Sequence, residues 1–578
     1  MMKRLSGLVL LLCLANFLSA QDMRMDTYCN PLNIDYTYMI YNSDKNISYR
    51  SGADPAVVEF RGEYYMFVTR SHGYWRSRDL LNWEFVRPGR NWYPQGCNAP
   101  AAHNYKDSVL YVTGDPSGSM SILYTDNPAS GNWEAVPAIL HNLQDPDLFI
   151  DDDGKAYMFW GSSNVYPIRG MELDKNRRFI KKGETKELFN LDMPKHGWER
   201  FGMNNDDEVT LRPFTEGAYM TKHNGKYYFQ YGAPGTEFKV YADGVYVSDS
   251  PLGPFVYQKH NPMCYKPGGY VQGAGHGGTF CDVKGNYWHV ATCMLSLKYK
   301  FERRIGLYPV AFDKDGVMYS STAFGDYPNW AEPMDVKNPA ERFTGWMLLS
   351  YGKPVEVSST DSIHAASNLT DESMRTYWAA RSGNPGEWAG IDLGSTKNVR
   401  AVQLNFYDHK AVQYNRAMDI YHQYRIFASE DGKEWTLVID KSDSDKDCPH
   451  DYIELNEPLR ARYLKYENVH MPTGNVALSG FRVFGNGDGD VPQAVKGLTV
   501  KRDRKDRRNA LISWQPEASA YGYNIYYGTA EGKMYNAITV LGQTEYDFRG
   551  LDADTDYYFT IEALNENGRS PLCKMTKN

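Results

Sequence analysis

Three acidic residues stand at the same position in three similar segments of the first half of the chain. Asp54 opens DPAVVEFRGEYYMFVT, Asp145 opens DPDLFIDDDGKAYMFWG, and Glu216 opens EGAYMTKHNGKYYFQYGA. One such acid alone would indicate little, because Asp-Pro pairs also begin ordinary turns. Three carboxylates in one cleft, however, suit the hydrolysis of a glycosidic bond. One acid protonates the leaving oxygen, a second, ionised, activates water or attacks the sugar, and a third raises the pKa of the acid.

The segments that carry these acids belong to a repeat of five copies. The other two copies begin at Ala99 and Gly277, and the first three copies start 45 and 46 residues apart. Each copy runs through an apolar strand, turns at a Gly, Asp or Lys tip, and returns through an aromatic strand. A repeat of this length and composition predicts a five-bladed β-propeller. The innermost strands of a propeller open on one face, so we expect the acids and His276 to converge there.

Residues from about 30 to 330 resemble glycoside hydrolase family 43, through GADPAVVEF, DPDLFIDDDGKAYMFWG and EGAYM. The resemblance implies Asp54 as general base, Glu216 as general acid, and Asp145 as the residue that raises the pKa of the acid and orients it. It also implies inversion of the anomeric configuration, with a water between base and acid. The sequence has EGA where the family often has Glu-Gly-Pro, which we expect to alter the shape of a loop.

The same resemblance implies further pocket residues. Arg303 in FERRIGLYPV is similar to the pocket arginine of the family, with Arg304 beside it as the alternative. His276 in GAGHGG is similar to a histidine that accompanies a central cation or water. The resemblance therefore implies a structural Ca²⁺ at His276, and no cofactor is required for the chemistry.

Aromatic side chains can stack on the apolar faces of sugars. The candidates for substrate binding are Trp75, Trp92, Tyr93 and Trp160. Aromatic residues also fill propeller cores, so the loop residues Trp92 and Tyr93 are favoured. Two long connections, residues 189–215 and 257–275, are expected to wall the pocket.

The implied function is that of an exported bacterial hydrolase of plant cell-wall polysaccharide or its oligosaccharides. The implied substrates are α-L-arabinofuranosides or β-D-xylosides, with β-D-galactofuranosides as an alternative. A propeller that binds glycan without turnover is the competing interpretation. The net charge of -8 is modest for 578 residues and gives no indication of nucleic-acid binding.

The N-terminus has the pattern of a cleaved secretory signal over residues 1–20. Lys3 and Arg4 precede a short apolar run that ends in Ser-Ala. The run is too short for a membrane span, so we expect export to the periplasm, the cell surface or the extracellular space. The seven cysteines that remain are sparse and lack zinc spacing, which indicates neither a disulfide framework nor redox chemistry.

Two further modules are expected after a propeller over residues 21–340. Residues 345–487, with NLTDESMRTYW and LSGFRVFG, resemble the coagulation factor discoidin-type β-sandwich, akin to carbohydrate-binding module family 32. Such modules bind sugars or serve as structural appendages, and both roles stay open. Residues 490–578, with Trp514 and with Tyr557 placed like a tyrosine corner, resemble a fibronectin type III domain, which we expect to be a spacer. Its basic run KRDRKDRR, from Lys501, is expected to be a solvated face. The predicted fold is therefore all-β.

Overall fold

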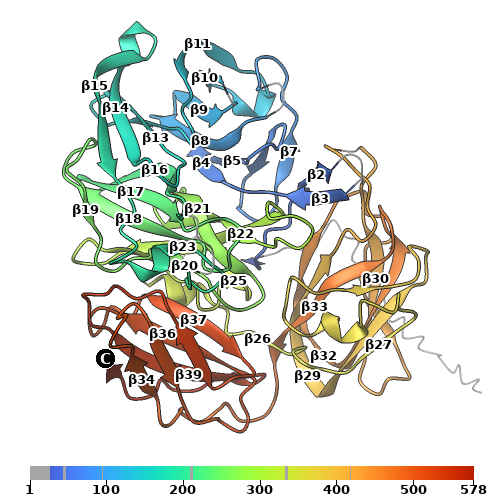
Figure 1. Ribbon diagram of the computed structural model, residues 1–578. Coiled ribbons are helices and arrows are strands. Elements are labelled where there is room, and N and C mark those ends of the chain that lie inside the picture. The colour runs from blue at the N-terminus through green and yellow to red at the C-terminus, as the bar shows by residue number, and fades with distance from the viewer. Residues whose placement is uncertain are drawn as a thin grey trace, which may run out of the picture.

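The computed structural model describes residues 26–578 except 43–46, 94–95, 117, 208–211, 332–335, 337 and 417. The predicted signal sequence lies outside the described residues. Those residues form strands and short 3-10 turns, and no α-helix is assigned among them (Figure 1). The described chain has no helix of the length and apolarity that a membrane crossing requires. The all-β prediction is confirmed. The 3-10 turns are η2 (Pro128–Ser130), η3 (Lys175–Arg177), η4 (Gly197–Glu199), η5 (Pro339–Arg342) and η6 (Ala366–Leu369).

Five blades form the propeller, in the blue to green part of Figure 1. Blades 1 to 3 are separate four-stranded antiparallel sheets, whereas blades 4 and 5 are joined into one nine-stranded sheet by a parallel pairing of β18 with β21. Blade 1 consists of β4 (Ala56–Phe60), β5 (Glu63–Phe67), β6 (Tyr74–Ser77) and β7 (Glu84–Val86). Blade 2 consists of β8 (Asn98–Tyr105), β9 (Val109–Asp115), β10 (Ser119–Thr125) and β11 (Glu134–His141). Blade 3 consists of β12 (Asp147–Ile150), β13 (Ala156–Trp160), β14 (Ile168–Asp174) and β15 (Ile180–Phe189). Blade 4 consists of β16 (Glu216–His223), β17 (Lys226–Ala233), β18 (Ala242–Ser248) and β19 (Val256–Tyr257), with β20 (Cys264–Tyr265) also paired to β18. Blade 5 consists of β21 (Gln272–Cys281), β22 (Tyr287–Met294), β23 (Arg303–Phe312) and β24 (Met318–Ser320).

The first strand of each blade lines the propeller axis. Neighbouring first strands contact one another from β4 through β8, β12 and β16 to β21, and β21 contacts β4, which closes the ring. At the start of each blade one residue has a left-handed backbone; these are Asp54 (φ 51°), Ala99 (φ 41°), Asp145 (φ 49°), Gly217 (φ 69°) and His276 (φ 44°). All five line one small axial cavity. Non-glycine residues rarely adopt this backbone, and strained residues of this kind cluster at functional sites.

The remaining strands build an N-terminal segment and two further domains. The N-terminal segment contributes β1 (Thr27–Tyr28), paired with β25 (Asn329–Trp330), and the hairpin β2 (Thr37–Asn42) and β3 (Ile47–Ser51). The discoidin-type sandwich consists of β26 (Met347–Leu348), β27 (Val355–Val357), β28 (Trp378–Ala379), β29 (Trp388–Phe406), β30 (Gln423–Ser429), β31 (Thr436–Asp440), β32 (His450–His470) and β33 (Ala477–Asn486). The fibronectin-type domain consists of β34 (Thr499–Arg502), β35 (Ala510–Ser513), β36 (Gly522–Gly528), β37 (Asn536–Leu541), β38 (Glu545–Phe548), β39 (Tyr558–Asn565), β40 (Gly568–Arg569) and β41 (Thr576–Lys577).

The connection between blades 3 and 4 docks the fibronectin-type domain, in red in Figure 1, against the propeller. His196 Nδ1 lies 2.9 Å from Asp552 Oδ1, and the backbone N–H of Gly197 donates to the Leu551 carbonyl at 3.0 Å. Trp198 is fully buried in a hydrophobic cluster that it shares with Leu551 and other residues of that domain. These segments therefore cover each other's apolar surface, so the fibronectin-type domain is docked and is not a free spacer. That the connection also walls the pocket stays a prediction.

The basic run from Lys501 takes part in the same interface. Arg508 donates from Nη1 to the carbonyl of Met193 at 2.8 Å, and Arg200 Nη1 lies 3.1 Å from Asp506 Oδ2. The prediction of a wholly solvated face is wrong for this part of the run. Its charges pair with the inserted connection, which lies far away in the sequence.

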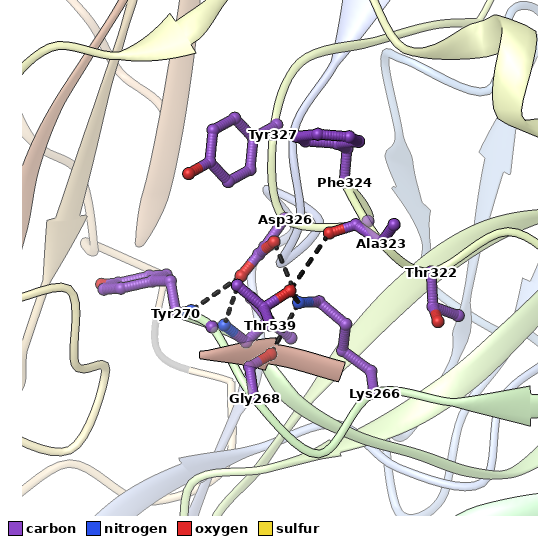
Figure 2. Close-up of polar contacts among 12 residues, drawn as sticks. Lys266, Gly268, Tyr270, Thr322, Ala323, Phe324, Asp326, Tyr327 and Thr539 are labelled. Carbon is purple, nitrogen blue, oxygen red and sulfur yellow. Dashed lines mark hydrogen bonds and ion pairs between the residues drawn. The ribbon is translucent and has the colours of Figure 1, made fainter. Parts of the chain in front are cut away.

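The connection between blades 4 and 5 docks a second surface of the same domain (Figure 2). Lys266 and Asp326 are both fully buried, and Lys266 Nζ lies 3.2 Å from Asp326 Oδ1. Lys266 also donates to the Gly268 carbonyl at 2.6 Å and to Thr539 Oγ1, on β37, at 3.4 Å. Asp326 Oδ2 accepts the backbone N–H of Tyr270 at 2.7 Å. Lys266 therefore connects the second predicted pocket wall to the fibronectin-type domain through Thr539, while its ion pair with Asp326 lies within the propeller.

The discoidin-type domain, yellow to orange in Figure 1, docks on the hairpin β2–β3. Asp408, in the loop after β29, accepts Tyr38 OH at 2.7 Å and lies 3.1 Å from Nε of Arg50, whose side chain is 1% exposed. Arg304 of blade 5 donates from Nε to His450 Nε2 at 2.7 Å. A buried arginine therefore links each of two propeller elements to this domain.

Candidate active site

The three acids predicted from the sequence come together at the propeller axis, where Asp54 and Asp145 line the small axial cavity and Glu216 lies beside it. Asp54 and Asp145 precede β4 and β12, and Glu216 is the first residue of β16. His276 lies between the carboxylates, with Nδ1 3.3 Å from Asp54 Oδ1 and 3.8 Å from Asp145 Oδ2. The donor atoms of Asp145, Glu216 and His276 all lie within 4.8 Å of one another. The five-blade arrangement thus brings residues far apart in the chain into one polar cluster.

Asp54 is held in its ionised form. Burial opposes its charge, but Arg303, His276 and the hydroxyl of Thr69 outweigh burial and lower the pKa of Asp54. Thr69 Oγ1 donates to Asp54 Oδ2 at 2.6 Å, and Arg303 Nη1 lies 3.5 Å from Asp54 Oδ1. A buried carboxylate that stays ionised beside a small cavity can accept a proton from a water bound there.

Asp145 and Glu216 are held toward the protonated form. Burial is the main reason that the pKa of Glu216 is raised, and the charge of Asp54 adds to it, although His276 and Tyr241 act in the opposite direction. Burial, together with the charges of Glu216 and Asp54, raises the pKa of Asp145 to about 7, against the opposing charge of His276. The two carboxyl groups therefore keep a proton near neutral pH, as a general acid requires.

Three residues that support these acids were not predicted from the sequence. Thr69 follows β5, Ser162 follows β13, and Tyr241 precedes β18. Tyr241 OH donates to Glu216 Oε1, and Ser162 Oγ donates to Glu216 Oε2 at 3.1 Å. Thr69 and Ser162 could have been found from the repeat. In an antiparallel hairpin the end of the second strand lies beside the start of the first, so residues just after β5 and β13 lie near the acids that begin the blades. Tyr241 lies in a connection without such a pattern.

His276 supplies the positive charge at the centre of the cluster. Burial opposes that charge, but Asp54, Asp145 and Glu216 outweigh burial and raise the pKa of His276. Asp145, Glu216 and His276 each offer one ligand atom, within 4.8 Å of one another, and the Ca²⁺ expected at His276 stays a prediction.

The structure distinguishes between the two candidates for the pocket arginine, Arg303 and Arg304. Arg303 lies beside Asp54, whereas Arg304 is directed toward His450 of the discoidin-type domain. Of the two neighbours, only Arg303 is positioned to contact a substrate at the carboxylates.

The predicted aromatic platforms lie in hydrophobic cores. Trp75 is 1% exposed and donates from Nε1 to Asp35, and Tyr93 is 7% exposed in the core between blades 1 and 2. The substrate-binding prediction is wrong for these two residues, because neighbouring side chains cover their rings. Trp92 packs partly buried against the same core, and Trp160 against the core between blades 2 and 3. The twist between blades leaves wedge-shaped gaps that large rings fill.

Comparison with known proteins relates each domain to a family. Residues 44–318 match the family model "Glycosyl hydrolases family 43", residues 354–480 match "F5/8 type C domain", and residues 492–576 match "Fibronectin type III domain". The order agrees with the resemblances read from the sequence.

Similar individual proteins match over part of their length. An arabinoxylan arabinofuranohydrolase of Paenibacillus polymyxa is 24% identical over 282 residues, which cover 39% of this chain and 42% of that protein. A xylosidase/arabinosidase of Humicola insolens is 30% identical over 204 residues, which cover 30% of this chain and 57% of that protein. A β-D-galactofuranosidase of Aspergillus niger is 23% identical over 236 residues, which cover 35% of this chain and 62% of that protein. The chain thus spans about half the length of the relatives it matches. Its propeller is thus similar to glycosyl hydrolase family 43 over residues 44–318, and the two domains that follow match the F5/8 type C and fibronectin type III families.

Proposed function

We propose that this protein hydrolyses glycosidic bonds with inversion of configuration at Asp54, Asp145 and Glu216. The supporting observation is that their surroundings shift the pKa values in opposite directions, down for Asp54 and up for Asp145 and Glu216. Pairs of carboxyl groups with separated pKa values supply the base and the acid of glycosidases.

The proposed reaction is a single displacement. Asp54 accepts a proton from water while the water oxygen attacks the anomeric carbon. Glu216 donates its proton to the leaving oxygen as the glycosidic bond breaks, so that proton and charge balance within the site. Asp145 raises the pKa of Glu216, so that Glu216 keeps its proton until the glycosidic bond breaks. Tyr241 and Ser162 orient the carboxyl group of Glu216 through the hydrogen bonds described above. Arg303 is positioned to bind a hydroxyl group of the sugar.

The proposed substrates are arabinose- or xylose-containing plant polysaccharides and their oligosaccharides. The names of the two relatives from Paenibacillus polymyxa and Humicola insolens support α-L-arabinofuranosidase or β-xylosidase activity. The Aspergillus niger relative makes β-D-galactofuranosides the alternative. We also propose that the protein is exported, on the basis of the signal pattern in residues 1–20.

The test offers the purified protein arabinan, arabinoxylan, xylan and galactofuranan oligosaccharides and follows the first anomer released by proton NMR. We expect an inverted product from one class of substrate. A retained product would contradict the water-mediated step, and no product from any substrate would favour glycan binding without turnover.

Two variants separate the roles of the acids. Glu216→Gln should lower kcat/KM on a natural oligosaccharide by about 10²–10⁴-fold, and much less on a dinitrophenyl glycoside, whose leaving group needs no proton. Asp54→Asn should impair both substrates alike, because water activation is needed in either case. Equal losses for Glu216→Gln on the two substrates would refute its assignment as the acid.

A further inference from the structure

A second polar cluster lies in the discoidin-type domain, away from the three carboxylates. Asp361 and His364 belong to the segment between β27 and η6, and His409 follows β29. Asp361 Oδ2 lies 2.7 Å from His364 Nδ1 and 3.3 Å from His409 Nε2. One nitrogen of each histidine and one oxygen of Asp361 thus lie within 4.8 Å of one another. The side chains are 12%, 21% and 11% exposed, in chain order.

Hydrogen bonds within the protein do not satisfy all the polar atoms of this cluster. His364 forms a hydrogen bond with Asp361, but His409 Nε2 is buried and has no hydrogen-bond partner among the described residues. Buried polar atoms usually have a partner, and an unpaired one calls for an ion or a water. The other nitrogen of His409, Nδ1, lies 3.2 Å from Tyr377 OH. Metal-binding histidines commonly use their second nitrogen in this way, to fix the orientation of the ring.

We propose that Asp361, His364 and His409 bind a divalent transition-metal ion of the Zn²⁺ type. Tetrahedral ligands at about 2.0–2.1 Å from Zn²⁺ lie roughly 3.3 Å apart. Asp361 Oδ2 and His409 Nε2 have this separation, whereas His364 Nδ1 lies closer to Asp361, at 2.7 Å, and would move outward to bind the ion. Two imidazoles and one carboxylate favour Zn²⁺ or a similar ion over Ca²⁺ or Mg²⁺, which prefer oxygen ligands.

The site would brace the contact between two domains. His409 directly follows Asp408, which holds Arg50 and Tyr38 of the hairpin β2–β3. The end of β3 at Ser51 lies three residues before Asp54. A bound ion would connect the loop that carries Asp408 to the segment of Asp361 and His364. Metal binding should therefore stabilise the docking of the discoidin-type domain beside the catalytic face.

The test uses the full chain, freed of metal by chelation, and titrates it with Zn²⁺ in a calorimeter and with Co²⁺ in a spectrophotometer. We expect one ion per chain at this site, strong visible bands of four-coordinate Co²⁺, and displacement of Co²⁺ by Zn²⁺. His409→Gln and Asp361→Asn should each weaken binding at least tenfold, while His470→Gln, a histidine of the same domain outside the cluster, should not.

Circular dichroism establishes that each variant is folded, and His364→Gln replaces any variant that is not. The absence of Co²⁺ bands, or unchanged affinity in His409→Gln and Asp361→Asn, would overturn the proposal. Binding that persists in His409→Gln but is lost in His276→Gln would also overturn it, because the ion would then lie at the catalytic cluster.

Discussion

At the scale of the residue, the proton held by Asp145 and Glu216 should determine how activity depends on pH. The pair must keep one proton, so kcat/KM should fall as the pH rises through about 7, the value to which the pKa of Asp145 is raised. The acidic side of the profile should lie below the ordinary pKa of 3.8, because the pKa of Asp54 is lowered. Asp145→Asn removes a negative charge beside Glu216 and should move the basic limb to lower pH. The measurement is the pH dependence of kcat/KM for both proteins.

Asp147 offers a matched control for this prediction. It lies two residues further along, at the start of β12, is 4% exposed, and has a pKa that burial raises to about 7. Its carboxylate accepts the backbone N–H of Met220 at 2.9 Å. Asp147→Asn should leave the basic limb in place. If the basic limb moves in Asp147→Asn and stays in place in Asp145→Asn, the group that titrates is Asp147, and the prediction for Asp145 is wrong.

At the scale of the element, the features that could be predicted from the sequence are strands and turns, which depend on residues close together in the chain. Alternating strands and turn residues recur in each blade, so the blades and the phase of Asp54, Asp145 and Glu216 could be read from the repeat. The roles of the two long connections could not, because Trp198 and Lys266 are buried by residues hundreds of positions away. For the same reason, a stacking platform and a core tryptophan look alike in sequence.

The buried ion pair between Lys266, in the connection before β21, and Asp326, after β24, can be tested by substitution. Asp326→Asn preserves the size of the side chain but leaves Lys266 buried without its carboxylate, which should cost roughly 3–5 kcal/mol of unfolding free energy. We expect Tm to fall by several degrees in calorimetry. Asp153→Asn, which removes an exposed ion pair with Lys155 at 2.7 Å, is the control and should leave Tm unchanged. Equal effects of the two substitutions would show that the buried pair contributes no more than a surface pair.

At the scale of the whole molecule, the shared core predicts that the domains unfold together. One hydrophobic cluster runs from Trp198 and Tyr265 of the propeller to Trp514 and Leu551 of the fibronectin-type domain. Buried charged side chains, Arg50 and Lys266, join the propeller to the domains on either side. We therefore expect one calorimetric transition for the full chain, with loss of hydrolysis at the same temperature.

Leu551→Ala tests whether this coupling is energetic. Leu551 is fully buried at the interface, and shortening such a leucine should cost about 2–5 kcal/mol. Leu572, in the same domain, is 54% exposed, so Leu572→Ala is the matched control and should change little. If the domains are coupled, Leu551→Ala lowers the temperature of the single transition and of the inactivation of hydrolysis together. If the fibronectin-type domain is independent, a separate transition moves while hydrolysis keeps its thermal stability, because the carboxylates lie wholly within the propeller.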